Sequence, residues 1–149
     1  MRTAALAALF AACLYAHANA QHHKPEFKAA SGAMANLPFS EAVRVGDMLY
    51  ISGSIGVKPG TMQLVEGGIV AETRQTMENI KAVVERHGSD MDHVVKCLVM
   101  MADMKEWAQM NAVYVTFFPK NKPARSALGA SGLALNARVE IECTAVVKM

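Results

Sequence analysis

Residues 138–148 read Arg-Val-Glu-Ile-Glu-Cys-Thr-Ala-Val-Val-Lys, and apolar and polar side chains alternate over most of this stretch. Alternate residues of a β-strand point to opposite faces of its sheet, so the pattern predicts a strand with one buried face. The residues predicted to face a layer of helices are Val139, Ile141, Cys143, Ala145 and Val147. Those predicted to face the other way are Arg138, Glu140, Glu142 and Thr144.

Two segments upstream have apolar side chains at the three- and four-residue spacing typical of amphipathic helices. The first runs from about Ile69 to His87, and Gly88 is placed to end it. The second begins near Asp103, which has the spacing of a capping box with Glu106, and it stops before Pro119. Its apolar stripe is predicted to be core and consists of Trp107, Met110, Tyr114 and Phe117.

The remaining elements are strands. Residues 40–45 and 48–52 flank Gly46-Asp47 and predict a hairpin, residues 55–68 predict a loop, and residues 93–101 and 124–130 predict two further strands. This order of elements predicts one α+β domain, with a single sheet and two helices packed on one face.

The strand over residues 93–101 is apolar on both faces. Val95, Cys97, Val99 and Met101 are predicted to point one way, and Val94, Leu98 and Met100 the other way. Because two helices cover only one face of a sheet, the second apolar face needs another cover. A second copy of the chain is the simplest one, so the sequence predicts a homo-oligomer.

The first twenty residues resemble a secretory signal peptide. Arg2 precedes an apolar run, and Ala18-Asn19-Ala20 fits a signal-peptidase site, so we expect cleavage after Ala20. The chain is then exported to the periplasm or secreted, residues 21–36 form a flexible arm, and residues 37–149 form the domain. A membrane-anchoring helix at the N-terminus and lipoprotein processing at Cys13 are the alternatives.

The charge and the cysteine content limit which partners and which cysteine chemistry the chain can have. The formal net charge is +2, with no polybasic patch, which argues against nucleic acid as a partner. No His or carboxylate cluster has metal-ligand spacing, so no metal is expected. An oxidising destination permits a disulfide between Cys97 and Cys143, but two buried thiols on neighbouring strands are the favoured interpretation.

Lys122-Pro123-Ala124-Arg125-Ser126 contains the strongest candidate for a functional side chain. An Arg behind a rigid proline turn has a fixed stem, and its guanidinium can grip a carboxylate with two parallel hydrogen bonds. Glu140 lies on the strand face turned away from the helices and is a candidate to act on a water or a nitrogen if the two share a cleft. The alternative is a surface Arg and a solvated or paired Glu.

Several stretches together resemble the RidA/YjgF (L-PSP) family of reactive-intermediate deaminases. They include Leu37 to Val43, Val45 to Gly53, Thr73 to Ile80, Pro123-Ala124-Arg125-Ser126 and Val139 to Glu142. The resemblance implies a chorismate-mutase-like α+β fold and a homotrimer with clefts between subunits. It also implies hydrolysis of enamines and imines of amino acids, such as 2-iminobutanoate and 2-iminopropanoate, to 2-oxo acids and ammonia without cofactor or metal.

The same resemblance implies roles for seven residues. Arg125 would bind the substrate carboxylate and Glu140 would position the attacking water. Gly53 and Ala127 would offer backbone groups, and Phe39, Ser52 and Asn111 would line the cleft. Phe39 stands where many members have Tyr, and Ala127 where the best-known deaminases have Cys. A non-catalytic module that binds small carboxylates and a chaperone-like interaction protein are the alternative functions on this scaffold.

Overall fold

The computed structural model describes residues 23–148, so the expectations for the signal segment lie outside the described residues. The strands are β1 (Glu26–Lys28), β2 (Ala42–Val45), β3 (Met48–Ile51), β4 (Ser54–Ile55), β5 (Val94–Met101), β6 (Ala124–Gly129) and β7 (Val139–Val146). The α-helices are α2 (Gly68–Arg86) and α3 (Trp107–Tyr114). Short 3₁₀ turns are η1 (Gly32–Met34), η2 (Met91–His93), η3 (Met104–Glu106), η4 (Val115–Phe117) and η5 (Ala134–Asn136).

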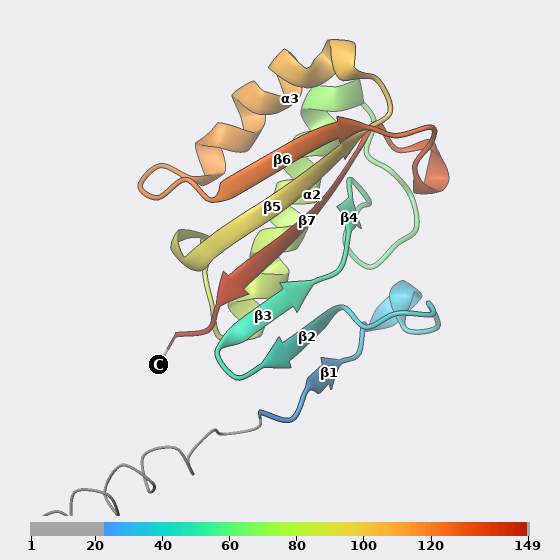
Figure 1. Ribbon diagram of the computed structural model, residues 1–149. Coiled ribbons are helices and arrows are strands. Elements are labelled where there is room, and N and C mark those ends of the chain that lie inside the picture. Colours follow the sequence, from blue (N-terminus) through green and yellow to red (C-terminus); the bar gives the residue numbers. More distant parts are fainter. Residues whose placement is uncertain (1–22, 149) are drawn as a thin grey trace, which may run out of the picture.

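All seven strands form one sheet with the order β1-β2-β3-β7-β5-β6, and β4 pairs separately with β7. Every pairing is antiparallel except that between β5 and β6. Parallel neighbours need a crossover connection, and α3 provides it between β5 and β6. Both helices cover the same face of the sheet (Figure 1). The predicted α+β class, with one sheet and two helices on one face, is therefore confirmed.

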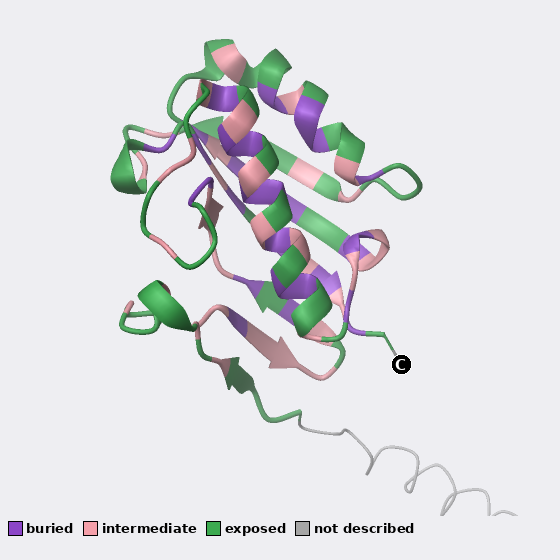
Figure 2. Cartoon of the chain, turned by 180° about the vertical axis from the view of Figure 1, so that it is seen from behind, coloured by how far each residue is buried: buried purple, intermediate pink, exposed green. Residues whose placement is uncertain are grey.

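The core lies between the helices and this face of the sheet. Buried residues line the inner sides of both helices, whereas their outer sides are exposed (Figure 2). Met77, Ile80 and Val84 of α2 are fully buried against the sheet. The residues of β7 predicted to face the helices are all buried, as is Val147 directly after the strand, in agreement with the alternating sequence. No helix in residues 23–148 has the length and apolarity needed to cross a membrane.

The first residues of strand β5 depart from the predicted alternation of buried and exposed side chains. Val94 pairs with Ala145 and Lys96 pairs with Thr144, so a bulge leaves Val95 as an extra residue. The bulge reverses the predicted orientation of two side chains, because Val94 is buried whereas Val95 is 42% exposed. From Cys97 onward the predicted faces are those observed, with Cys97, Val99 and Met101 buried.

Two short strands lie in segments predicted to be irregular. β1, inside the segment 21–36 predicted to be a flexible arm, pairs with β2, and Phe27 lies opposite Val43. β4 lies at the start of the predicted loop and pairs with β7. Both strands are held by main-chain hydrogen bonds, which need no apolar alternation, so the side-chain pattern gives no signal for them.

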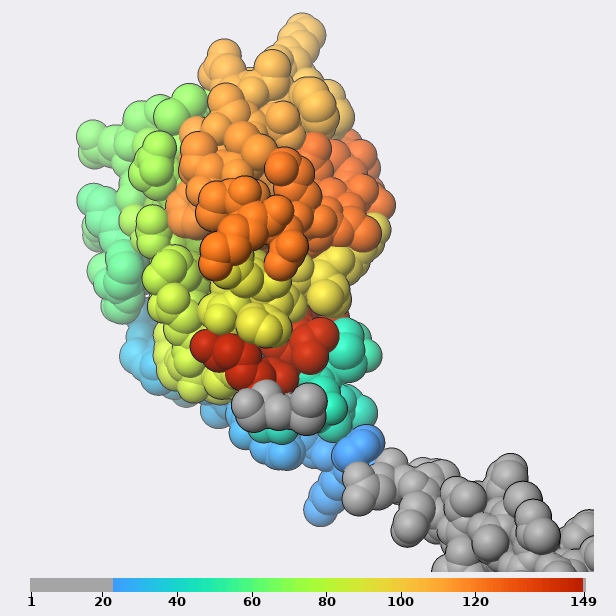
Figure 3. All heavy atoms as spheres, turned by 90° about the vertical axis from the view of Figure 1, so that its left-hand side faces the viewer, coloured from blue at the N-terminus to red at the C-terminus, as the bar shows by residue number. Residues whose placement is uncertain are grey.

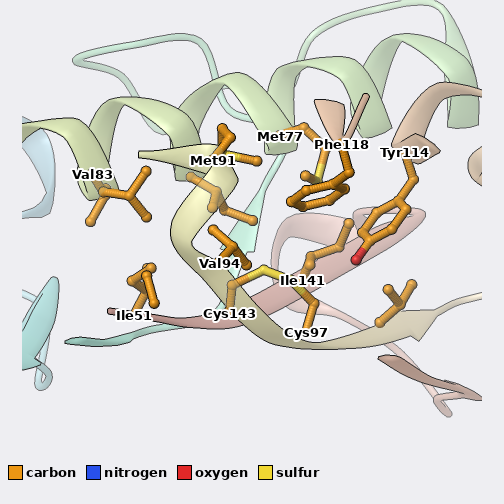
Figure 4. Close-up of a cluster of buried hydrophobic side chains, with 14 of the residues drawn as sticks. Ile51, Met77, Val83, Met91, Val94, Cys97, Tyr114, Phe118, Ile141 and Cys143 are labelled. Atoms are coloured by element: carbon orange, nitrogen blue, oxygen red, sulfur yellow. A yellow bond between two sulfur atoms is a disulfide. The ribbon is translucent and has the colours of Figure 1, made fainter. Parts of the chain in front are cut away.

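Cys97 and Cys143 form a disulfide bond, contrary to the favoured interpretation of two free thiols. The two residues are direct partners on neighbouring strands β5 and β7, and both side chains point into the core (Figure 4). The disulfide ties the neighbouring strands β5 and β7 together.

The start of α3 also differs from the expected capping box. Asp103 accepts a hydrogen bond from the backbone N–H of Lys105 at 2.9 Å, as a capping residue does. Glu106 does not return the contact, because its carboxylate accepts hydrogen bonds from Nε and Nη2 of the Arg138 guanidinium. The loop before β7 is thereby fastened to the start of α3.

Candidate active site

Arg125 lies on β6, the edge strand beside α3, and its half-buried side chain points toward that helix. β6 and α3 are adjacent on the surface, as the orange and red-orange atoms of Figure 3 show. The Nη1 atom of Arg125 donates a hydrogen bond of 2.8 Å to Oδ1 of Asn111. Two of the predicted site residues are thus in direct contact within one chain.

Two aromatic rings of α3 also contact this guanidinium. Its Cζ atom lies 4.7 Å from the ring centre of Tyr114 and 5.6 Å from that of Trp107, within the range of cation–π attraction. Tyr114 is buried as predicted, but Trp107 is 39% exposed, so its assignment to the core was wrong. Trp107, Asn111 and Tyr114 recur at four- and three-residue spacing, and this pattern is the sequence signal for a helix face directed at Arg125.

The positive charge of Arg125 has no carboxylate within ion-pair distance among residues 23–148. Arg86 and Arg138, by contrast, each bind a carboxylate, that of Glu41 and that of Glu106. Because Asn111 occupies only Nη1, the other guanidinium N–H groups remain available to an anion. A planar carboxylate fits such a group of parallel donors.

Glu140 lies on β7, where it is paired with Met100 on one side and Ile55 of β4 on the other. Its carboxylate lies directly over Gly53, because a Cβ atom added to Gly53 would be 2.1 Å from Oε1 of Glu140. A glycine at this position is therefore needed for the carboxylate to lie where it does. Glu140 and Gly53 form a second pair of predicted site residues in contact.

Ser52 directly precedes Gly53 in the chain, and a hydrogen bond links it to the segment of Phe39. The Ser52 hydroxyl donates a 2.7 Å hydrogen bond to the carbonyl oxygen of Ser40, which fixes the segment that follows Phe39. Phe39 is 47% exposed, so its ring is open to a ligand or to another chain. Ser52 thereby links Gly53 to the segment that carries Phe39.

The environment of Glu140 favours its protonated form. Partial burial is the main cause that raises the pKa of its carboxyl group, and the negative charge of Glu142 adds to the effect. A carboxylate with a raised pKa is a better proton acceptor than an ordinary one, provided that the pH exceeds that pKa. This electrostatic setting suits a group that takes a proton from water.

Sheet register places Arg125 and Glu140 on opposite faces of one chain. Arg125 pairs with Cys97, whose side chain points to the helices, and Ala127 pairs with the buried Val99 on the same face. Glu140 pairs with Met100 on the open face. One protomer therefore carries the predicted site as two groups, with Arg125, Asn111 and Ala127 in the first. The second comprises Phe39, Ser52, Gly53 and Glu140.

Two hollows of the surface lie away from these residues. One of about 760 Å³ is lined by residues 23–26 and by Arg44, Gly46 and Asp47. Another, of about 290 Å³, lies on the open face of the sheet between Tyr50, Leu98 and Thr144. Neither contains a predicted site residue, and no three His, Cys, Asp or Glu side chains within residues 23–148 gather closely enough to bind a metal ion.

A protein-family model described as endoribonuclease L-PSP matches residues 30–147, a span that includes both groups of site residues. The chain belongs to this family, which is also called RidA/YjgF. A mouse member named 2-iminobutanoate/2-iminopropanoate deaminase is 41% identical over 109 residues, which cover 73% of this chain and 81% of the mouse protein.

Solved structures of L-PSP family members share the fold. The yeast protein YEO7 superposes with a TM-score of 0.78 at 34% identity, covering 84% of this chain and all of the yeast chain. The YjgF gene product of E. coli gives a TM-score of 0.76 at 32% identity, covering 83% of this chain and 99% of the other. The fold expected from the family resemblance is therefore confirmed.

The raised pKa of Glu140 yields a prediction that is independent of catalysis. We expect a ¹³C NMR titration to show that the pKa of the Glu140 carboxyl group is raised above that of a solvated glutamate. Glu142→Gln removes a like charge and lowers this pKa, although burial keeps it raised. Glu66→Gln, which changes an exposed carboxylate in a loop, is the matched control and leaves it unchanged. An unaltered Glu140 titration in Glu142→Gln would show that the two charges do not interact.

Proposed function

We propose that this L-PSP family member hydrolyses small enamines and imines of amino acids to 2-oxo acids and ammonia. The observation that carries the proposal is the guanidinium of Arg125, which is fixed by Asn111 and two aromatic rings and has no carboxylate partner among the described residues. A guanidinium held in a fixed orientation in this way can bind the carboxylate that every amino-acid-derived imine carries. The relatives named 2-iminobutanoate/2-iminopropanoate deaminase support the same reaction class.

The reaction needs few catalytic groups, because an iminium carbon is already electrophilic. Arg125 holds the carboxylate and so fixes the position of the neighbouring C=N bond. Glu140 accepts a proton from the attacking water as its oxygen bonds to that carbon. The carboxyl group of Glu140 then returns this proton to the nitrogen, and the C–N bond breaks with loss of ammonia. As the carbon becomes the carbonyl of a 2-oxo acid, the carboxylate takes up the hydroxyl proton and releases it to water. Orientation and one group that accepts and returns a proton suffice for these steps.

We propose further that the protein is a homotrimer in which each cleft forms between two chains. Arg125 lies on the edge strand β6, where a neighbouring chain can approach. The open face of the sheet, which carries Glu140, also exposes Tyr50 and Leu128, 50% and 46% of whose surfaces contact solvent in one protomer. Apposition of an edge of one chain to the open face of the next would cover apolar surface and join the two groups of site residues.

Two residues that differ from those common in the family affect the chemistry of the proposed cleft. Phe39 offers a ring without a hydroxyl, so it contributes apolar surface and no hydrogen bond. Ala127 has no reactive side chain, so its contribution is restricted to its backbone groups on the edge strand β6. Neither residue removes the carboxylate anchor or the proton acceptor, and the proposal retains hydrolysis as the activity.

We also propose that the chain is exported, with residues 1–20 as a cleaved signal peptide. The charged start, the apolar run and the Ala18-Asn19-Ala20 site support this. The disulfide between Cys97 and Cys143 supports it independently, because such bonds persist in oxidising compartments and are rare in the cytosol. The imines that reach the protein would then be those outside the cytoplasm.

The proposed activity is tested by generating 2-iminobutanoate in the presence of the protein and following 2-oxobutanoate release. We expect the wild-type protein to accelerate release, and Arg125→Ala to lower kcat/KM by about 100-fold or more, because two charge-assisted hydrogen bonds to the carboxylate are lost. Arg125→Lys keeps the charge without the fork of donors and restores only part of the activity.

Arg74→Ala is the matched control, since Arg74 is an exposed arginine on α2 and its loss should leave turnover unchanged. Wild-type protein that is no faster than buffer would contradict the proposal. Saturable binding of 2-oxobutanoate that needs Arg125, without turnover, would instead identify a carboxylate-binding module. Interaction activity that survives Arg125→Ala would identify the chaperone-like alternative.

Export and the disulfide are tested together by producing the full chain in a bacterial host. We expect an exported protein that begins at Gln21 and has no free thiols, as measured by mass spectrometry after alkylation. Cys97→Ala/Cys143→Ala should lower the free energy of unfolding by about 4 kcal/mol, from the loop closed over a separation of 46 residues. A protein that keeps residues 1–20 inside the cell, or is processed at Cys13, would contradict the proposed route.

A further inference from the structure

Trp107 is an exposed aromatic residue with a specific contact. It is the first residue of α3 and retains 39% of its accessible surface, whereas the core beneath the helix is filled by Met110, Tyr114 and Phe118. Its ring centre lies 5.6 Å from Cζ of Arg125. The contact that orients Trp107 is therefore made with a charged side chain at the surface and not with the core.

Three residues on one face of α3 contact the same guanidinium in three different ways. Asn111 fixes Nη1 through a hydrogen bond of 2.8 Å, the buried ring of Tyr114 lies 4.7 Å from Cζ, and Trp107 adds a second ring. Burial raises the pKa of Tyr114 to about 12, so its ring stays neutral beside the cation. Together these contacts restrict a flexible side chain to one orientation.

We propose that Trp107 is a positioning residue that orients the guanidinium of Arg125 toward the substrate carboxylate. The inference rests on the proposed function, because it assigns Trp107 to the carboxylate anchor of that same site. Trp107 differs from Tyr114 in that it can be replaced without emptying a core position. An indole ring also attracts a guanidinium more strongly than other aromatic rings do.

The proposal predicts which kinetic constant changes. Arg125 binds the carboxylate in the bound substrate and in the transition state alike. In Trp107→Ala the guanidinium is still directed by Asn111 and Tyr114, so the position of the C=N bond is kept. Loss of a contact that orients the carboxylate anchor therefore raises KM and leaves kcat nearly unchanged. Trp107→Ala should raise KM for 2-iminobutanoate by about fivefold, the size expected for one partly exposed cation–π contact.

Conservative variants separate this role from simple apolar packing. Trp107→Phe keeps an aromatic face and should stay within about twofold of the wild-type KM. Trp107→Leu keeps apolar bulk without a π-face and should resemble Trp107→Ala. Val115→Ala is the matched control, because Val115 is 40% exposed beyond the C-terminal end of the same helix and should have no effect.

Binding provides a readout that does not depend on turnover. Trp107 is the only tryptophan of the chain, so its fluorescence reports directly on the surroundings of Arg125. Titration with 2-oxobutanoate should change this fluorescence in the wild-type protein and not in Arg125→Ala. Calorimetry should show a Kd for 2-oxobutanoate that rises in Trp107→Leu by the same factor as KM.

The outcomes distinguish failure of this inference from failure of the proposed function. Wild-type turnover with an unchanged KM and Kd in Trp107→Leu would show that Trp107 is only an apolar cover. A loss of kcat at constant KM in Trp107→Ala would also contradict a positioning role. Absence of turnover in the wild type, with a Kd that still depends on Trp107, would overturn the hydrolysis and leave the anchor intact. A wild-type protein that neither hydrolyses 2-iminobutanoate nor binds 2-oxobutanoate would overturn both.

Discussion

The alternation of side chains across the sheet is the constraint on which the rest of the account depends. It directs Arg125 to the helix face of β6 and Glu140 to the open face of β7, so one chain cannot bring the two together across its own sheet. The same alternation leaves an open face without helices. A cleft shared by two chains would meet both conditions at once, since the edge strand of one chain would meet the open face of the next.

The proposed site also depends on how the guanidinium of Arg125 is held, since it has no carboxylate partner among the described residues. Arg125 is half-buried, and its charge is stabilised by an amide oxygen and two ring faces of α3 and not by an ion pair. These neutral partners orient the guanidinium without neutralising it, so its attraction for an anionic ligand is retained. On the other side of the sheet, burial and Glu142 make Glu140 a stronger proton acceptor than a solvated carboxylate.

The sequence predicted the helices and strands in which apolar side chains recur at a regular spacing. It did not predict features that depend on main-chain contacts between distant segments or on the surroundings of a single residue. The hairpin of β2 and β3, helix α2 and the buried face of β7 follow from local patterns. The bulge at Val95, the pairing of β1 and the disulfide depend on strands that are distant in sequence. Trp107 was missed because apolar spacing alone does not distinguish a core residue from one that covers a charged side chain.

Mixing of two inactive variants tests the shared cleft most directly. Arg125→Ala and Glu140→Gln chains are refolded separately and as an equal mixture, and imine hydrolysis is measured in each sample. A cleft that takes Arg125 from one chain and Glu140 from its neighbour predicts two inactive homo-oligomers and a mixture with about a quarter of the wild-type activity, because one in four interfaces joins the two intact groups. A mixture as inactive as its components, despite chain exchange verified by mass spectrometry, would contradict the account.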